Sequence, residues 1–349
     1  MELLDASDAS LRRAGAALAR GCLVALPTET VYGLGADAFD PIAVARVFEV
    51  KGRPSFDPLI VHVASIEDVF RVAAEVPPAA RRLMEALWPG PLTLVLPKRS
   101  ELPDLVTSGL PTVAVRFPSH PVGRAIIAYS GTAVAAPSAN PFGYLSPTRA
   151  EHVVRLLGEK VDFVVDGGPC AVGVESTVLD MTREPPLLLR PGGMEIEAIE
   201  AVAGRIELFH AAAPGAAGLP QSSPGLMESH YAPRARLRLF EAGGIGQALA
   251  LDPAAAPGGP ESEAGLPLRV AALVFDAAAA AALGPAAARF AALRSLSGRG
   301  DLVEAAAALF ALLHELDSLG MDEIWAESVP ARGLGPAIND RLYKASRKG

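Results

Sequence analysis

The chain has 349 residues, of which 50% are hydrophobic, 20% are charged and 5% are aromatic. At roughly 100 to 200 residues per domain, this length predicts two globular domains. The formal net charge of −8 argues against a chain that holds nucleic acid mainly through phosphate contacts, because such proteins normally present a positive field. Cys22 and Cys170 have no CxxC or HxxxH neighbours, which argues against a disulfide framework or a structural zinc site.

The start of the chain and its most apolar stretches both argue against export and against a membrane. Asp5 and Asp8 stand where a signal peptide would need a basic start and an apolar core. The stretches near 271–290 and 302–316 are rich in alanine but are interrupted by charged residues, so we expect helices of a globular domain there. We therefore expect a cytoplasmic protein with no membrane partner.

The N-terminal half predicts an α/β domain with a large sheet. A helix over 10–20 would have Asp8 as its capping residue and would stop at Gly21. Short apolar runs bounded by proline and glycine predict strands at 22–27, 58–64, 91–97, 112–117, 132–136, 162–166, 176–181 and 187–190. Apolar spacing predicts helices near 41–50, 79–87, 120–129 and 148–157.

A run of small residues and prolines over 211–225 lacks apolar periodicity and predicts a linker. After it, the pattern predicts strands at 236–240, 268–275 and 321–327 and helices at 286–294, 301–318 and 335–346, which together form a small three-layer α/β domain. We place the first domain at 1–207, a linker and possible active-site lid at 208–234, and the second domain at 235–349.

Arg116 is the first polar residue that the strand pattern does not explain. Alternate side chains of a strand share a face, so Thr112, Ala114 and Arg116 lie together in TVAVRF. A guanidinium on a mostly apolar face costs on the order of several kcal/mol unless an anion receives it. A structural ion pair or an exposed sheet face would explain Arg116 alone equally well.

The same interruption recurs at the ends of other predicted strands. These positions are His62, Ser138, Asn140, Ser176 and Arg190. Ligands of α/β proteins bind where strand ends and their loops converge, so the recurrence predicts a ligand cavity.

Lys51 and Arg53 bracket a glycine directly after the predicted helix 41–50. The compact, mobile ammonium group of lysine and the planar guanidinium of arginine together suit a polyphosphate. A solvated basic loop would have the same sequence pattern. There is no Walker loop, and the glycines of YGLGAD (32–37) lack the context of a dinucleotide fingerprint and instead indicate turns. A GxSxG nucleophile motif is also absent.

Seven motifs, in chain order, resemble the YrdC-like threonylcarbamoyl-AMP synthase family over about residues 10–200. They are PTETVYGLG, KGRPSFDPLIVHV, WPGPLTLVLP, TVAVRFPSHP, APSANPFGYLSPT, GVESTVLD and LLRPGG. With SHYAP (229–233) and GLGPAINDRLYKAS (333–346), the whole chain is similar to the two-domain form of the family. The resemblance implies a twisted mixed sheet with helices around a deep, positively charged cavity.

The resemblance implies that L-threonine, bicarbonate and ATP give L-threonylcarbamoyladenylate and pyrophosphate. The product would pass to a partner that transfers the threonylcarbamoyl group to adenosine in tRNA, and contact with tRNA itself would be weak or indirect. Mg²⁺ would accompany ATP, with protein ligands that the sequence does not assign. No tightly bound organic cofactor is implied.

Site residues are carried over by motif. Catalysis would depend on the KxR and SxN signature, which is Lys51, Arg53, Ser138 and Asn140. Threonine would be held by Thr30, His62, Arg116 and Ser176, with its carboxylate on Arg116. Nucleotide contacts would be Lys51, Arg53, Asp57, Thr112, Ser138, Asn140, Ser146 and Arg190, with His230 and Tyr231 closing the site. Asp57 departs from the family, which usually has Asn there.

Two alternatives belong to other classes of protein. An RNA-binding module would need a basic groove and would show no dependence on threonine, and the net charge opposes it. A carbamoyltransferase of metal-centre maturation shares this domain, but it resembles longer chains with zinc-finger cysteines, which this chain lacks.

Overall fold

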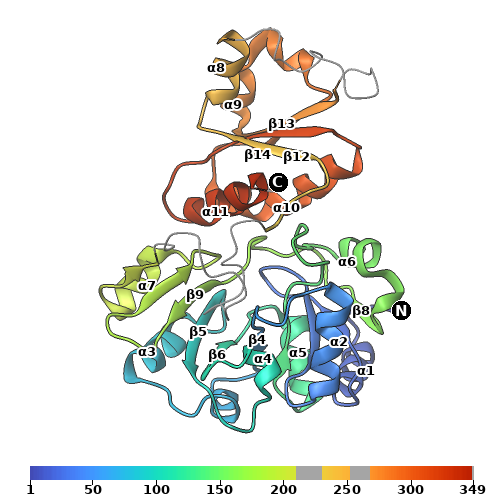
Figure 1. The fold of residues 1–349 in the computed structure, drawn as a ribbon, viewed down its shortest axis with the longest axis vertical. Helices are drawn as coiled ribbons and strands as arrows, with labels where there is room; N and C mark the ends of the chain where they lie inside the picture. The colour runs from blue at the N-terminus through green and yellow to red at the C-terminus, as the bar shows by residue number, and fades with distance from the viewer. Residues whose placement is uncertain (210–229, 252–267, 348–349) are drawn as a thin grey trace. The chain divides into compact units, whose positions relative to one another are not determined.

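The computed structural model describes residues 1–209, 230–251 and 268–347. The chain divides into two compact units (Figure 1), the first comprising Met1–Phe142 and Ser146–Leu226 and the second Gly143–Leu145 and Met227–Gly349. The predicted linker at 211–225 lies outside the described residues, and the domain boundaries drawn from the sequence stay a prediction. No helix in the three described ranges has the length and apolar character needed to cross a membrane.

In the described part of the first unit, eleven strands form one mixed sheet. Neighbouring pairs run both ways: β4 and β6 are parallel, whereas β5 and β6 are antiparallel. In sheet order the strands are β1 (Glu2–Leu4), β8 (Phe163–Val165), β2 (Val24–Leu26), β3 (Gly33–Asp37), β7 (Val134–Ala135), β4 (Ile60–His62), β6 (Thr112–Arg116), β5 (Leu92–Pro97), β9 (Thr177–Asp180), β10 (Leu187–Arg190) and β11 (Glu207–Leu208).

Two groups of helices pack on this sheet. Residues of α2, α3, α4, α6 and α7 join the larger apolar core, and residues of α1 and α5 join a second core next to β2 and β8. The helices are α1 (Asp8–Leu18), α2 (Pro41–Lys51), α3 (Pro78–Leu87), α4 (Asp104–Thr107), α5 (Pro121–Ser130), α6 (Ala150–Leu157) and α7 (Ile196–Ala203), with short 3₁₀ turns at Glu67–Arg71 and Gly158–Lys160. The predicted mixed α/β fold is confirmed.

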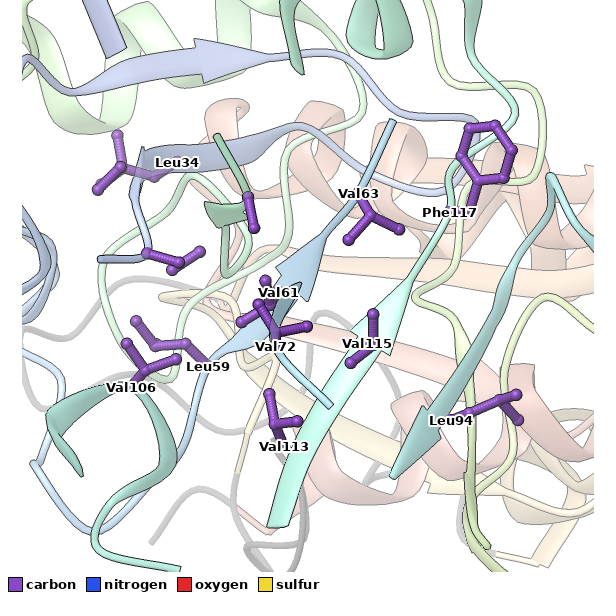
Figure 2. Close-up of a cluster of buried hydrophobic side chains, with 14 of the residues drawn as sticks. Leu34, Leu59, Val61, Val63, Val72, Leu94, Val106, Val113, Val115 and Phe117 are labelled. Atoms are coloured by element: carbon purple, nitrogen blue, oxygen red, sulfur yellow. The ribbon is translucent and has the colours of Figure 1, made fainter. Parts of the chain in front are cut away.

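The central strands of the sheet have one apolar face and one face that carries polar side chains. Val61, Val113 and Val115 point into the larger core (Figure 2), as the alternation in TVAVRF predicts. On the opposite face, Ile60 and Ala114 belong to a smaller apolar cluster. His62 and Arg116 stand two residues further along the same strands, so they share this second face.

All eight strands expected in the first unit are present, but the interpretation of YGLGAD as turns was wrong. Gly33–Asp37 forms β3, which pairs with β2 and β7. A Cβ on Gly35 would lie 2.9 Å from Leu26 Cδ2 and 3.0 Å from Val134 Cγ1. The glycine is therefore needed for close packing between strands. The first helix is also capped differently, since Ser7 accepts the capping hydrogen bond and Asp8 is its first residue.

The second unit is a three-layer α/β domain, as expected. In its described part, a parallel sheet has the order β12 (Arg236–Phe240), β15 (Glu323–Glu327), β13 (Val270–Asp276) and β14 (Ala292–Ser297). In Figure 1, α8 (Gly244–Leu251) and α9 (Ala277–Ala282) lie on one face, and α10 (Leu302–Ser318) and α11 (Gly335–Ser346) lie on the other.

The strand expected at 268–275 is confirmed as β13, so the helix expected for the start of the 271–290 stretch was wrong. The helix expected over 286–294 was also wrong, because this stretch contains a 3₁₀ helix at Gly284–Arg289 followed by β14. Alanine has the highest intrinsic helix propensity, which favoured a helix in both places. Parallel pairing of β13 with β14 and β15 outweighs that propensity, because it satisfies the backbone of buried residues.

Candidate active site

Two polar residues end neighbouring parallel strands. His62 ends β4 and Arg116 ends β6, and the two are partners in the strand register. Each side chain follows an apolar strand that is buried in the sheet, and each residue is only 3% exposed. The sequence placed both at a site for threonine, and the structure brings them side by side.

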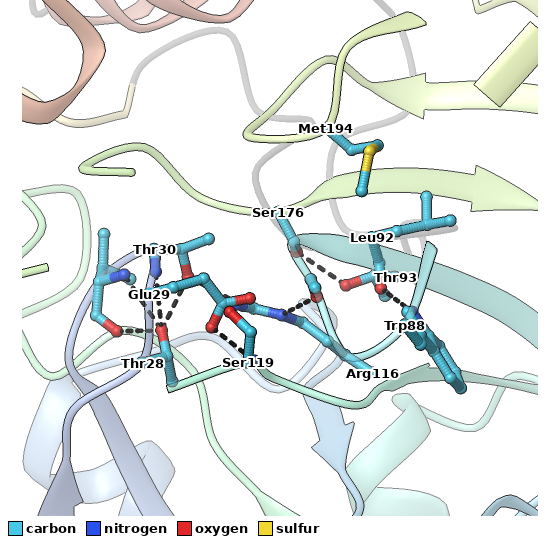
Figure 3. A network of polar contacts seen from close by, with 12 residues as sticks. Thr28, Glu29, Thr30, Trp88, Leu92, Thr93, Arg116, Ser119, Ser176 and Met194 are labelled. Atoms are coloured by element: carbon cyan, nitrogen blue, oxygen red, sulfur yellow. Dashed lines mark hydrogen bonds and ion pairs between the residues drawn. The ribbon is translucent and has the colours of Figure 1, made fainter. Parts of the chain in front are cut away.

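The Arg116 guanidinium already has partners on three sides (Figure 3). Its Nη1 donates to Thr30 Oγ1 at 2.8 Å, and its Nε donates to the Gly90 carbonyl oxygen at 3.3 Å. Its Nη2 lies 2.8 Å from Glu29 Oε1. The structure therefore joins Arg116 to Thr30, which the sequence assigned to the same threonine site, and adds a buried carboxylate that the sequence reasoning missed.

Glu29 is the charged partner of Arg116. Burial, the largest single effect, raises the pKa of this carboxyl, but the Arg116 charge together with the hydrogen bonds to the carboxylate holds the pKa below its usual value. The second oxygen, Oε2, accepts a hydrogen bond from the Ser119 backbone N–H at 3.1 Å. An acidic residue between the two threonines of PTET, immediately before a buried segment, was the signal that could have revealed it.

His62 is electrically neutral in this setting. Burial, assisted by the Arg116 charge, lowers the pKa of its imidazole to about 3. Among the described residues, its Nδ1 has no hydrogen-bond partner. A neutral imidazole with one unpaired nitrogen is suited to exchange a hydrogen bond with an uncharged ligand group such as a hydroxyl.

Ser176 connects the Arg116 region with Arg190. Its Oγ shares a hydrogen bond of 2.7 Å with Thr93 Oγ1, and Thr93 is a second residue that the sequence reasoning missed. Arg190 Nη2 donates to the Ser176 carbonyl oxygen at 2.9 Å and to Ser176 Oγ at 3.4 Å. The residues predicted for threonine and for nucleotide thus adjoin at Ser176.

Lys51 is directed at the backbone of the SxN motif. It is the last residue of α2, and Gly52 turns the chain there with φ of 60°. Its Nζ donates to the carbonyl oxygens of Ser138 and Asn140, both at 2.5 Å. Burial, together with the Arg53 charge, lowers the Lys51 pKa well below its usual range. The KxR and SxN motifs therefore meet, and Lys51 holds the SxN turn in place.

Arg53 and Asp57 brace the loop that follows α2. Arg53 Nη2 lies 3.0 Å from Asp57 Oδ2, and Arg53 Nε donates to the Asp57 carbonyl oxygen at 2.9 Å. Asp57 is fully buried, and within the described structure neither carboxylate oxygen has a hydrogen bond. Burial raises the pKa of Asp57, with the Arg53 charge acting in the opposite direction.

The remaining residues predicted for nucleotide fall into two groups. Ser146 Oγ donates to Glu175 Oε1, and Glu175 is one of the charges that act on Lys51, so Ser146 belongs with the signature residues. Thr112 begins β6, four residues before Arg116 and on the same face. Glu175 is a third residue of this region that was not expected.

His230 and Tyr231 belong to the second unit. The Tyr231 ring lies 5.7 Å from the Phe310 ring and 5.1 Å from the Arg341 guanidinium, and its φ is 61°. A positive φ is uncommon for an aromatic residue and marks a constrained backbone. Their contact with a nucleotide stays a prediction.

Within the described residues, no group of three or more His, Cys, Asp or Glu side chains could hold a metal ion. The arrangement instead gathers cations. Lys51, Arg53 and Arg190 lie close enough to shift the pKa of Asp57, and Arg116 stands beyond Ser176. A site with this charge can bind an anionic ligand of extended shape.

Two family models together match almost the whole chain. The Sua5/YciO/YrdC model, described as "Telomere recombination", matches residues 16–192. The model described as "Threonylcarbamoyl-AMP synthase, C-terminal domain" matches residues 194–347. The first unit therefore has the Sua5/YrdC fold. A structure of Escherichia coli YciO, 22% identical, covers 57% of this chain and 98% of its own with a TM-score of 0.52, which agrees with that fold.

Full-length relatives narrow the assignment. A threonylcarbamoyl-AMP synthase of Pyrococcus abyssi is 42% identical over 96% of this chain and 94% of its own, and one of Bacillus subtilis is 42% identical over 98% and 94%. The crystal structure of P. abyssi Sua5 complexed with L-threonine is 39% identical, covers 99% of this chain and 98% of its own, and has a TM-score of 0.86. The chain belongs to the threonylcarbamoyl-AMP synthase family.

Proposed function

We propose that the protein makes L-threonylcarbamoyladenylate from L-threonine, bicarbonate and ATP and releases pyrophosphate. The observation that carries the proposal is the contact of Arg190, one of the cations near Asp57, with Ser176. Ser176 also bonds to Thr93, whose strand β5 pairs with β6, the strand that ends in Arg116. Relatives of the same family are named threonylcarbamoyl-AMP synthases, and the P. abyssi protein has been crystallised with L-threonine. The product serves threonylcarbamoylation of adenosine in tRNA.

Threonine binds on the second face of the sheet. Arg116 receives its carboxylate, because a guanidinium offers paired donors to two oxygens. Thr30 and neutral His62 hold the hydroxyl group, and Ser176 adds a further hydrogen bond. These roles are supported by the burial of all four residues and by the unpaired Nδ1 of His62.

ATP binds beside the threonine. Arg53 and Arg190 face the triphosphate charge, and Lys51 shapes the SxN turn, whose Ser138 and Asn140 contact the nucleotide together with Asp57, Thr112 and Ser146. The support is the pair of hydrogen bonds from Lys51 to that turn and the proximity of the three cations to Asp57.

The chemistry requires alignment and charge stabilisation, with no protein nucleophile. The threonine amine forms a carbamate with bicarbonate and releases water. A carbamate oxygen then attacks the α-phosphate, and the bond to the leaving pyrophosphate breaks. Holding the two reactants together supplies much of the rate, and the arginines stabilise negative charge as pyrophosphate departs.

Mg²⁺ would accompany the triphosphate. The described residues contain no acidic cluster able to hold the ion alone, so phosphate oxygens and water would be expected to supply most of its ligands. Asp57 fits such an arrangement as a single hard oxygen donor, because neither of its carboxylate oxygens has a hydrogen bond in the described structure. When bound, the ion neutralises charge on the phosphates.

The linker closes the site, with His230 and Tyr231 shielding the labile carbamate from water. Deleting residues 221–233 should abolish adenylate formation while both units keep their thermal unfolding transitions. Unchanged turnover by the deletion variant would rule the lid out.

We also propose a first domain at 1–207 and a second at 235–349, and transfer of the product in the cytoplasm to a tRNA-modifying partner.

The direct test is incubation of the protein with ATP, bicarbonate and labelled threonine. We expect pyrophosphate and the mixed anhydride to form in equal amounts, and only when all three substrates are present. A protein that binds tRNA tightly and with strong salt dependence, but turns over neither ATP nor threonine, would instead be the RNA-binding module considered above.

A further inference from the structure

Glu29 and Arg116 form a buried pair of unusual geometry (Figure 3). Glu29 is 6% exposed and Arg116 is 3% exposed, and Oε1 lies 2.8 Å from Nη2. Within the described residues, these two atoms face each other as an ion pair and neither has a hydrogen bond to a third group. Buried polar atoms without hydrogen bonds cost free energy. A buried ion pair whose facing atoms have no further hydrogen bond can take up a ligand that carries both a positive and a negative group.

The surrounding structure fixes both charged groups in place. Ser119 N–H holds Glu29 through Oε2, and Thr30 holds Arg116 through Nη1. Each group is therefore anchored to the protein through one side of its charged end, and the other side forms the Glu29–Arg116 ion pair. This is the arrangement expected of side chains that are preorganised to bind a substrate.

The ligand that matches this pair is a zwitterion. An α-amino acid carries a carboxylate and an ammonium group on the same carbon atom, so a water-excluded site must offer a cation and an anion next to each other. We propose that Glu29 receives the α-ammonium group of threonine while Arg116 receives the carboxylate, and that Glu29 then takes the proton that the ammonium must lose. This assignment rests on the proposed function.

The proton transfer is required by the chemistry. An ammonium nitrogen has no lone pair, so it cannot attack the carbon of bicarbonate. Transfer of one proton gives the neutral amine and the protonated Glu29 carboxyl. The amine nitrogen then bonds to the bicarbonate carbon, and a second amine proton leaves with the departing hydroxide as water. The carbamate that remains carries one negative charge, so atoms and charge balance.

Other titratable groups near Glu29 are poor candidates for this role. Burial lowers the pKa of His120 and of His62, so both imidazoles are neutral at neutral pH and offer no negative charge to an ammonium group. Burial raises the pKa of the Cys170 thiol, which is therefore protonated. Arg116 remains the cation of the group. Glu29 is the carboxylate that faces it.

Substrate binding itself would strengthen Glu29 as a base. In the free protein, the Arg116 charge opposes the effect of burial on this carboxyl. A substrate carboxylate bound to Arg116 partly neutralises the Arg116 charge and adds a second negative charge near Glu29. Both changes favour the protonated form of Glu29, so its proton affinity rises when threonine is in place.

The first test compares threonine with 3-hydroxybutanoate, which lacks only the amino group, by titration calorimetry at pH 7. The wild-type protein should bind threonine more tightly, and Glu29→Gln should reduce this preference about 10- to 100-fold, as expected for loss of a charge-assisted contact. Glu85→Gln is the matched control, because Glu85 forms only an exposed ion pair with Arg81. An unchanged preference in Glu29→Gln would overturn the proposal.

The second test is the pH profile of adenylate formation at saturating ATP. Without an internal base, only threonine that is already deprotonated reacts. The rate with Glu29→Gln should therefore rise about tenfold per pH unit above neutrality, and the wild-type rate should change much less. Parallel profiles would show that Glu29 takes no proton.

Glu29→Asp separates these effects from a folding defect. It keeps the negative charge with a shorter reach, so it should retain part of the threonine preference and the flatter pH profile. Should Glu29→Gln fail to fold, this comparison still decides: a Glu29→Asp variant that unfolds like wild type but has lost both properties would refute the role of the charge. A wild-type protein that forms no adenylate would refute the proposed function instead.

Discussion

Charged residues at strand ends in this protein are held by backbone groups and by each other before any ligand arrives. Lys51 donates to two carbonyl oxygens, Arg190 donates to Ser176, and Arg116 faces Glu29. Such contacts reduce the reorganisation that binding would otherwise require. They also make the effects of substitutions on stability and on ligand binding inseparable unless both are measured.

Arg116→Ala and Lys51→Met should differ in which substrate they affect. Removing Arg116 deletes the proposed carboxylate site and leaves Glu29 buried without its cation, which costs about 3–5 kcal/mol of unfolding free energy. Lys51→Met keeps the side-chain length but leaves two carbonyl oxygens without their donor, which costs about 1–3 kcal/mol. We expect the KM for threonine to rise most in the first variant and the KM for ATP in the second.

Steady-state kinetics with each substrate varied in turn checks this division, with thermal unfolding measured alongside. Arg12→Ala is a control on the surface, where the ion pair with Asp8 is exposed. Equal effects of the two variants on both KM values would contradict separate roles for Lys51 and Arg116.

His62 should make the protein less stable in mild acid. Its pKa is about 3 in the folded chain against 6.5 for an unperturbed imidazole, so the unfolded chain binds more protons between these values. The stability is present above pH 6.5 and is lost as the pH falls toward 3, by at most about 1.4 kcal/mol per pH unit. His62→Gln should flatten this part of the stability curve, which chemical denaturation at a series of pH values measures. A variant whose curve matches the wild type would show that His62 is not the group responsible.

At the scale of elements, strand packing decides where site residues stand. The PGG turn at 191–193 follows β10 and packs against the segment that carries Ser176. A Cβ on Gly192 would lie 2.3 Å from the Ser176 carbonyl carbon and 2.4 Å from the Glu175 carbonyl oxygen. The glycine permits a backbone approach that no other residue allows, and this approach sets the position of Ser176 under Arg190.

Gly192→Ala should therefore damage both stability and activity. The added methyl group must displace backbone, at a cost of about 1–3 kcal/mol or more, and the displaced backbone carries Ser176. Gly298→Ala is the control, since nothing lies within 4 Å of its added Cβ. Thermal unfolding and threonine titration measure the two effects. Wild-type threonine affinity in Gly192→Ala would show that the Ser176 position does not depend on this contact.

At the scale of the whole molecule, net charge limits the way the protein can meet tRNA. The chain carries 39 acidic against 31 basic residues. Several of its arginines lie buried among the site residues, where they are not available to a phosphate backbone at the surface.

We expect affinity for tRNA to remain in the non-specific range, with a Kd no tighter than about 10⁻⁶ M at physiological salt. Filter binding over a range of salt concentrations measures it, with a noncognate RNA of similar length as the control. Tighter binding with a steep dependence on salt would contradict indirect contact and would favour a docking surface for RNA on this protein.

Sequence patterns predicted much of the architecture because they are local. Apolar runs bounded by proline and glycine located every expected strand of the first unit, and alternation within TVAVRF assigned Arg116 to the face opposite the main core. The motifs carried the family resemblance. Prediction from local residue preferences failed at β3, where glycines had indicated turns, and at β14, where alanines had indicated a helix. Both segments form strands because neighbouring strands pair with them.

The sequence alone determined the class of fold, the family and the set of polar residues at strand ends. Only the tertiary structure decided which of these residues meet: Lys51 with the SxN turn, Arg190 with Ser176, and Arg116 with Glu29. Glu29, Thr93 and Glu175 were missed because their roles arise from partners at least 29 positions away in the chain or on another strand. Periodicity reports the face on which a side chain lies, whereas the partner across that face is set by how the chain packs in three dimensions.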